Sequence, residues 1–159
     1  MLRNGFQVSI FEKSRGLGGR IATRRIENGI FNHGASRIPN FRNYNNLPIN
    51  LKGLLETALK KKILIPQGNY CTSFASMKTF TSYLSKGIAI QKNSEVIAIK
   101  RLNPGIELLF NNASKIQLKD DFLVFAIPQP QVLSLIKNDF QEIFDLVQPA
   151  KMYPSISGL

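Results

Sequence analysis

The sequence contains very little cysteine, histidine and tryptophan, and this scarcity excludes several kinds of site. Cys71 is the only cysteine, His33 is the only histidine, and tryptophan is absent. A single cysteine cannot form an intramolecular disulfide, and these two residues cannot supply the ligand set of a structural zinc site. We therefore predict no metal centre, and we expect a reducing, cytoplasmic setting.

Long apolar runs are also missing. The longest run of note, Phe122 to Ile127, is far shorter than the roughly 20 residues that a membrane-spanning helix needs. The residues that follow Met1 are polar and contain no apolar stretch of the kind found in signal peptides. We therefore expect neither a transmembrane segment nor a secretory leader.

Acidic residues are scarce, with 10 Asp and Glu against 21 Lys and Arg, and the net charge is +11. Such a balance can indicate nucleic-acid binding. The densest basic groups, however, fall in different predicted elements and are not interleaved with aromatic residues: 24–25, 60–62 and 100–101. Solvated surfaces explain this scatter, so a nucleic-acid partner is not expected. The 43% hydrophobic content indicates a globular chain.

The first part of the chain predicts a strand followed by a turn. Residues 6–12 alternate apolar and polar side chains, which is typical of a strand. Gly5 is suited to end a helix, whose last turn would occupy residues 2–4. Residues 14–20 form a glycine-rich turn, and residues 29–50 are rich in Asn, Pro and Gly, which indicates loop with short extended pieces.

Helical periodicity appears next. Apolar residues in 51–59 recur at the spacing of an amphipathic helix, and residues 67–73 suggest a connecting loop. Ser76 is a candidate N-cap for a second helix, in which we assign Met77 and Phe80 to the core.

The remaining residues predict strands and then helix. Short strands are expected at 88–90, 95–101 and 106–110, the last two joined as a hairpin by a turn-forming Asn-Pro-Gly tripeptide. The unalternating run at 122–127 predicts a strand buried in a parallel sheet. Residues 132–147 have a helical period with a break near Asp139.

One segment carries most of the functional information. Residues 12–25 read Glu-Lys-Ser-Arg-Gly-Leu-Gly-Gly-Arg-Ile-Ala-Thr-Arg-Arg, directly after the first predicted strand. This block closely resembles the FAD-binding region of renalase-like and amine-oxidase-like FAD-dependent oxidoreductases, which are flavoproteins with a Rossmann-type nucleotide-binding domain. From the residues alone, a surface turn with solvated arginines is about equally plausible; with the resemblance, the cofactor interpretation is favoured.

The resemblance is chemically coherent. A carboxylate at the end of a strand can accept the ribose hydroxyls of an adenosine, and Glu12 has that position. Glycines at 16, 18 and 19 let backbone N–H groups approach a pyrophosphate, and basic side chains of the same block can add charge-assisted bonds. The expected cofactor-binding residues of this block are Glu12, Lys13, Arg15, Gly16, Gly18, Gly19 and Arg20.

Residues 31–35 resemble a family segment, Phe-Asp-His-Gly-Ala, that passes near the flavin ring. The resemblance adds His33, Gly34 and Ala35 to the expected cofactor site, although a packed or backbone-bonded histidine is an equal alternative for His33. Asn32 stands where the family has aspartate, and Ser36 follows where the family has an amide. These departures lie close to the expected reaction centre.

Two later segments also resemble the family. The resemblance implies that the backbone of Val96 bonds adenine, and that Ala126 and Pro128 lie near the cofactor-binding edge of the sheet. Plain strand and turn chemistry explains Ala126 and Pro128 equally well.

Together these features predict an α/β fold, with a partial FAD/NAD(P)-binding Rossmann-like parallel sheet and the start of an antiparallel β-containing substrate domain. The expected divisions are a partial FAD-binding βαβ unit, the start of the substrate domain with connecting helices, a return to the FAD-binding domain, and a tail: 1–36, 37–93, 94–147 and 148–159. Because the first strand and its glycine loop would precede Met1, we expect a fragment that is inactive alone.

For the complete parent protein, the resemblance implies hydride transfer from a small-molecule substrate to FAD, with amines and reduced nicotinamide-like molecules such as NAD(P)H both open as substrates. No residue is assigned a catalytic role. The alternative is a non-catalytic protein, acting as a basic interaction module or completed by a second polypeptide that supplies the missing segments.

Overall fold

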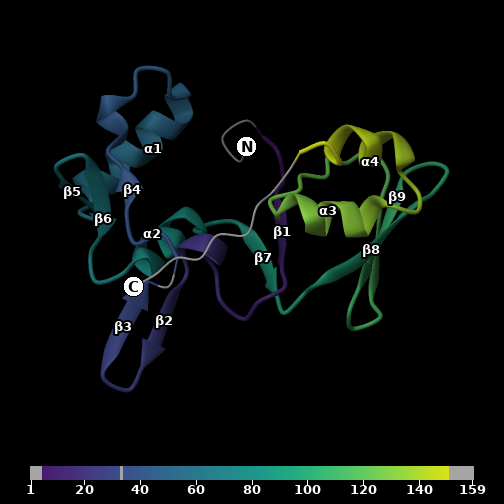
Figure 1. Ribbon diagram of the computed structural model, residues 1–159, viewed down its shortest axis with the longest axis horizontal. Coiled ribbons are helices and arrows are strands. Elements are labelled where there is room, and N and C mark those ends of the chain that lie inside the picture. The colour runs from purple at the N-terminus through teal and green to yellow at the C-terminus, as the bar shows by residue number, and fades with distance from the viewer. Residues whose placement is uncertain (1–4, 33, 151–159) are drawn as a thin grey trace. The chain divides into compact units, whose positions relative to one another are not determined.

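The computed structural model describes residues 5–32 and 34–150 (Figure 1). The chain divides into two compact units, Met1–Asn93 and Ser94–Leu159. The helical turn expected at residues 2–4 and the position of His33 lie outside the described residues. Gly5 has a φ of 81°, in the left-handed region that suits a glycine at the end of a helix. Among the described helices, none has the length and apolar character needed to cross a membrane.

The first unit contains a parallel ladder of two strands. β1 (Ser9–Glu12) pairs with β7 (Ala89–Lys92), so that Glu12 lies opposite Lys92. Both strands were predicted, with their bounds displaced by up to three residues. A parallel pair needs a long crossover between its strands, and here the crossover contains the other elements of the unit.

A hairpin follows the glycine-rich turn. β2 (Thr23–Ile26) pairs in antiparallel fashion with β3 (Gly29–Asn32) across a two-residue turn. β3 and the short β4 (Ile38–Pro39) are the extended pieces expected in residues 29–50. β2 was not predicted, because its Thr-Arg-Arg-Ile sequence is too polar to show alternation.

A second antiparallel sheet has the strand order β4-β6-β5, where β5 is Leu64–Gln67 and β6 is Tyr70–Ser73. The loop predicted at residues 67–73 is therefore wrong. Gly68, with a φ of 58°, adopts the left-handed conformation that allows the tight turn between the two strands.

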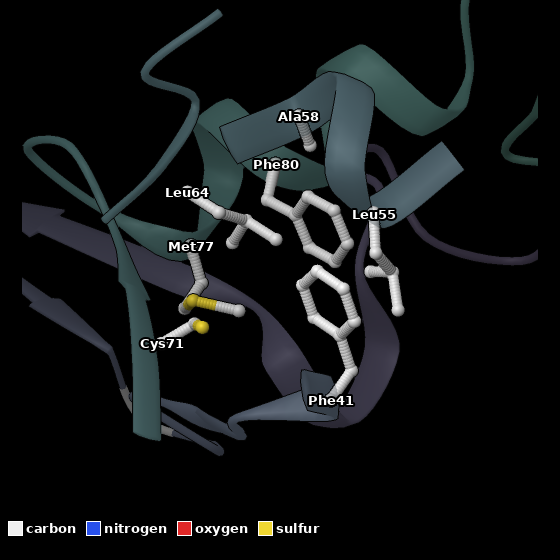
Figure 2. Close-up of a cluster of buried hydrophobic side chains, with 7 residues drawn as sticks. All are labelled: Phe41, Leu55, Ala58, Leu64, Cys71, Met77 and Phe80. Carbon is white, nitrogen blue, oxygen red and sulfur yellow. The ribbon is translucent and has the colours of Figure 1, made fainter. Parts of the chain in front are cut away.

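Two helices cover this sheet and form the core of the unit. α1 (Ile49–Lys60) and α2 (Met77–Leu84) confirm the two predicted helices. Their apolar residues meet side chains from the sheet and from the 3-10 helix Phe41–Asn43. Figure 2 shows the rings of Phe41 and Phe80 directed toward each other. The buried cluster comprises Phe41, Leu55, Ala58, Leu64, Cys71, Met77 and Phe80. Met77 and Phe80 are thus core residues, as predicted.

The second unit is an antiparallel meander with two helices. Its sheet has the order β10-β9-β8, from β8 (Val96–Arg101), β9 (Ile106–Phe110) and β10 (Lys115–Leu118). The predicted hairpin is confirmed, and β10 was not foreseen. α3 (Gln129–Ile136) packs on β8, and α4 (Gln141–Val147) packs on α3 (Figure 1). The predicted break near Asp139 separates the two helices.

The buried strand predicted at residues 122–127 is wrong. This segment joins none of the sheets formed by the described residues. The side chains of Phe122 and Val124 are 86% and 65% exposed. Apolar composition favours a buried strand, but a strand exists only when a neighbouring strand exchanges backbone hydrogen bonds with it. The chain nevertheless has the mixed α/β fold, with parallel and antiparallel sheets, that the sequence predicted.

Candidate functional site

Glu12 is the last residue of β1, at the carboxyl end of the parallel ladder. Its Oε1 accepts a hydrogen bond of 2.8 Å from the backbone N–H of Ser14, which closes the turn after the strand. A carboxylate has several acceptor positions, so this bond orients the group without saturating it. Glu12 is half-buried and remains within reach of a ligand at the strand end.

The glycine-rich turn contains two consecutive residues with positive φ. Gly18 has a φ of 119° and Gly19 a φ of 46°, both in the region that favours glycine. A Cβ on Gly18 would also come within 3.2 Å of the Ala22 Cα. The backbone then enters a short 3-10 helix, Gly19–Ile21, closed by a 2.8 Å bond from the Ile21 N–H to the Gly18 carbonyl. The glycines therefore create a tight turn with accessible backbone.

Gly34 and Ala35 pack directly against this turn. The N–H of Ala35 donates a 2.8 Å hydrogen bond to the carbonyl of Arg20. A Cβ on Gly34 would overlap that same carbonyl, so only glycine permits the approach. The structure thus brings together two segments that were separate in the sequence analysis.

Asn32 connects the hairpin to the start of α2. Its Oδ1 accepts a 3.1 Å bond from the Met77 N–H and a 2.8 Å bond from the Thr23 hydroxyl. The Thr23 oxygen in turn accepts a 3.2 Å bond from the Lys78 N–H. Ser76 occupies the N-cap position, but its side chain makes no capping bond, because Asn32 and Thr23 take these backbone donors. Ser76 is thus the N-cap residue, as predicted, but the expected capping by its side chain is wrong.

The other expected cofactor residues are dispersed. Lys13, Arg15 and Gly16 lie exposed in the turn after β1. Val96, at the start of β8, Ala126 and Pro128 belong to the second unit. Ala126 is exposed, and the Pro128 carbonyl accepts the N–H groups of the first turn of α3.

Cys71 is buried, and the acidic residues that the structure describes form no metal-binding cluster. Cys71 lies in β6 with no exposed surface, and burial raises the pKa of its thiol, while the nearby Arg42 guanidinium acts in the opposite direction. The thiol therefore stays protonated and poorly nucleophilic. Within the ranges 5–32 and 34–150, no three Cys, His, Asp or Glu side chains cluster as metal ligands.

Sequence reasoning missed a group of basic residues beside α2. A hollow of about 110 Å³ lies there, and the residues that line it are Arg15, Gly16, Leu17, Lys78, Thr81, Ser82 and Lys92. An open groove of about 430 Å³ runs along the same helix. No local sequence pattern marks this group, because Lys92 comes near the turn only through the pairing of β7 with β1.

Comparison with known proteins supports the nucleotide interpretation of the first segment. No curated protein matches the chain. Residues 1–49, which contain Glu12, the glycine-rich turn and the Gly34–Ala35 contact, match the model of a family described as an NAD(P)-binding Rossmann-like domain. The chain therefore carries a Rossmann-like NAD(P)-binding region at its N-terminus.

Proposed function

We propose that residues 12–35 hold the adenosine diphosphate part of a dinucleotide, and that the chain serves an FAD-dependent oxidoreductase of the renalase-like or amine-oxidase-like kind. The observation that carries this proposal is that three features lie next to one another. Glu12 ends a parallel strand, Gly18 and Gly19 form a left-handed turn, and Gly34 packs on that turn. Ligands of open α/β sheets bind beyond the carboxyl ends of the strands, where these residues lie.

Glu12 would bind the ribose. The Ser14 N–H fixes one carboxylate oxygen, and the remaining lone pairs can accept the ribose hydroxyls. The hydroxyls and the charged acceptor would form bonds stronger than those between neutral groups. The β-strand and the closed turn hold the carboxylate in place before the ligand arrives, which lowers the entropic cost of binding.

The glycine-rich turn would receive the pyrophosphate. Its glycines place no Cβ between the backbone and a ligand, and successive backbone N–H groups in such turns form concave anion sites. Arg15 and Arg20 have exposed side chains on the same turn and can pair with phosphate oxygens, with Lys13 adding charge nearby.

Residues 12–35 would bind and orient FAD, which would supply the hydride acceptor for the substrate. The roles expected for His33, Val96, Ala126 and Pro128 stay predictions. Amines and reduced nicotinamides remain equal candidates for the substrate.

Calorimetric titration of the chain with ADP, FAD, NAD⁺ and NADP⁺ tests the proposal. We expect all ligands with an ADP part to bind and FAD to bind most tightly. Glu12→Gln should weaken each by about tenfold or more, because a hydrogen bond to a charged group contributes about 1.5–3 kcal/mol. Glu27→Gln is the matched control, since it removes the same charge from the exposed β2–β3 turn. Equal losses in both variants would contradict the ribose role of Glu12, and equal affinities for FAD and NAD⁺ would remove the FAD assignment.

A further inference from the structure

We propose that the hollow beside α2 is a binding site for a phosphate group, carried by a phosphomonoester or free in solution. The site lies against the α2 side of the glycine-rich turn. It shares Arg15 and Gly16 with the turn proposed for the pyrophosphate, whereas Lys78, Thr81 and Ser82 of α2 lie outside that turn. The Glu12 carboxylate is absent from its lining.

Three basic residues from distant parts of the chain line the hollow. Arg15 comes from the turn after β1, Lys78 from the first turn of α2, and Lys92 from the last position of β7. Hydroxyl groups of Thr81 and Ser82 complete the polar lining. No Asp or Glu is among the described residues that line the hollow.

This arrangement favours an anion electrostatically. Cations held close together repel one another, and a shared anion converts that repulsion into attraction. Within the part of the chain that the structure describes, neither Arg15 nor Lys78 forms an ion pair with a carboxylate. The Thr81 hydroxyl donates a 3.0 Å bond to the Lys78 carbonyl, so Ser82 is the better placed hydroxyl donor for a ligand oxygen.

The volume selects a small anion. About 110 Å³ corresponds to a few water molecules at about 30 Å³ each, whereas pockets for drug-sized ligands span about 300–1,000 Å³. A tetrahedral oxyanion fits this space and a whole dinucleotide does not. The guanidinium of Arg15 and the ammonium group of Lys78 match the multiple oxygens of a phosphate.

The adjoining groove provides room for an organic substituent. The hollow and the groove share Lys78 and Ser82, and the groove is also lined by the apolar side chains of Ile30, Ile63 and Tyr83. A phosphomonoester can therefore place its phosphate among the cations and an apolar body along the groove. Inorganic phosphate would occupy the hollow alone.

The experiment is thermal melting of the full chain at constant ionic strength, with chloride, inorganic phosphate or phenyl phosphate. A ligand that binds only the folded state raises the melting temperature, and at a given concentration a tighter ligand raises it further. We expect both phosphate compounds to raise it relative to chloride. Lys78→Gln and Arg15→Gln should each weaken phosphate binding about fivefold, a loss reduced by solvent exposure. Lys52→Gln, which removes an exposed charge on α1, is the matched control and should have no effect.

The two sources of the phosphate are distinguished in the same experiment. If phenyl phosphate binds more tightly than inorganic phosphate, and Ile30→Ser removes that difference, the site belongs to a phosphomonoester. If the two compounds bind equally, the site belongs to the free anion. The proposal is overturned if phosphate gives no rise beyond chloride, or if Lys52→Gln weakens binding as much as Lys78→Gln. Loss of ADP binding with phosphate binding retained would remove the proposed dinucleotide function and leave this site intact.

Discussion

The Oδ1 atom of Asn32 accepts a 3.1 Å hydrogen bond from the backbone N–H of Met77, 45 residues along the chain. This bond joins the end of β3 to the start of α2, and Met77 is itself fully buried in the core of the first unit. An aspartate at this position would present the same kind of acceptor oxygen to the helix N-terminus. The residue at this position therefore has a structural role that either side chain can fill.

Substitutions at Asn32 test this role. Asn32→Leu removes the acceptor and should lower the free energy of unfolding by about 1–2 kcal/mol, the usual cost of a lost helix cap. Asn32→Asp keeps the acceptor and adds a negative charge near the helix N-terminus, so it should be neutral or slightly stabilising. Urea unfolding measures both variants. Equal destabilisation by Leu and Asp would show that the bond to Met77 does not support the helix.

A pair of glycine substitutions tests the contact between Gly34 and Arg20. Gly34→Ala should destabilise the chain by about 1–3 kcal/mol, because the new Cβ overlaps the Arg20 carbonyl and forces the backbone to shift. Gly53→Ala is the control, since it lies within α1 with open space at the Cβ position and should stabilise the helix by about 0.5–1 kcal/mol. Urea unfolding measures the free energy of unfolding of both variants. A change in the same direction in both would refute the close approach of Gly34 to the Arg20 carbonyl.

The Cys71 thiol should react slowly in the folded chain. Burial raises its pKa above the ordinary value, so less thiolate is present at a given pH, and the side chain is also inaccessible. The fold favours the neutral thiol, and stability should therefore decline as pH rises above the pKa of the unfolded thiol. Reaction with a chromogenic disulfide at mildly alkaline pH measures this. We expect a slow rate that increases sharply in denaturant; a rate unchanged by denaturant would contradict the burial.

Arg101 should stabilise the contact between β8 and the α3–α4 turn. Its Nε donates a 3.1 Å bond to the Asp139 carbonyl, its guanidinium pairs with Glu142, and it stacks 4.6 Å from the Phe140 ring centre. Arg101→Met should therefore cost about 1 kcal/mol. Lys100→Met is the control, because it removes an exposed neighbouring charge. Equal costs in urea unfolding would show that the specific contacts of Arg101 contribute nothing.

The pH dependence of that contact has a defined sign. The pKa of the Glu142 carboxyl is lowered. The larger cause is a hydrogen bond from the backbone N–H of Glu142, and the second is the hydrogen bond from Arg101. The stabilisation from Glu142 is thus present above the pKa of the unfolded carboxyl and is lost as pH falls through the lower folded value. The difference in stability between Arg101→Met and the unaltered chain should shrink over that acidic range. A difference independent of pH would contradict the ion pair.

Local sequence patterns predicted the elements that are held together by interactions between residues close in sequence. The spacing of leucines in α1 and the Asn103–Gly105 turn between β8 and β9 are visible within a few residues. β6 was missed although a tight turn joins it to β5; its other partner, β4, is distant in sequence, and no local pattern around residue 70 indicates either pairing. The failure at 122–127 has the same physical origin, since apolar composition does not supply a pairing partner.

The residues of the candidate site also divide into those that a local motif positions and those that only the fold brings together. Glu12 and the glycine-rich turn are adjacent in sequence, so their arrangement could be predicted from the motif. Arg15, Lys78 and Lys92 converge only through the fold, and composition alone suggested scattered, solvated charges. The capping role of Asn32 likewise depends on where α2 begins, which no local pattern around residue 32 indicates.

Amide-detected NMR titration of the chain with ADP is the most direct test of the central claim that residues 12–35 bind a dinucleotide. We predict saturable shifts concentrated on the backbone N–H groups of Gly16, Gly18, Gly19 and Ala35. The N–H groups of Gly53 in α1 and Gly68 between β5 and β6 are internal controls and should stay unchanged. Absence of saturable shifts, or shifts of similar size at the control glycines, would contradict the account.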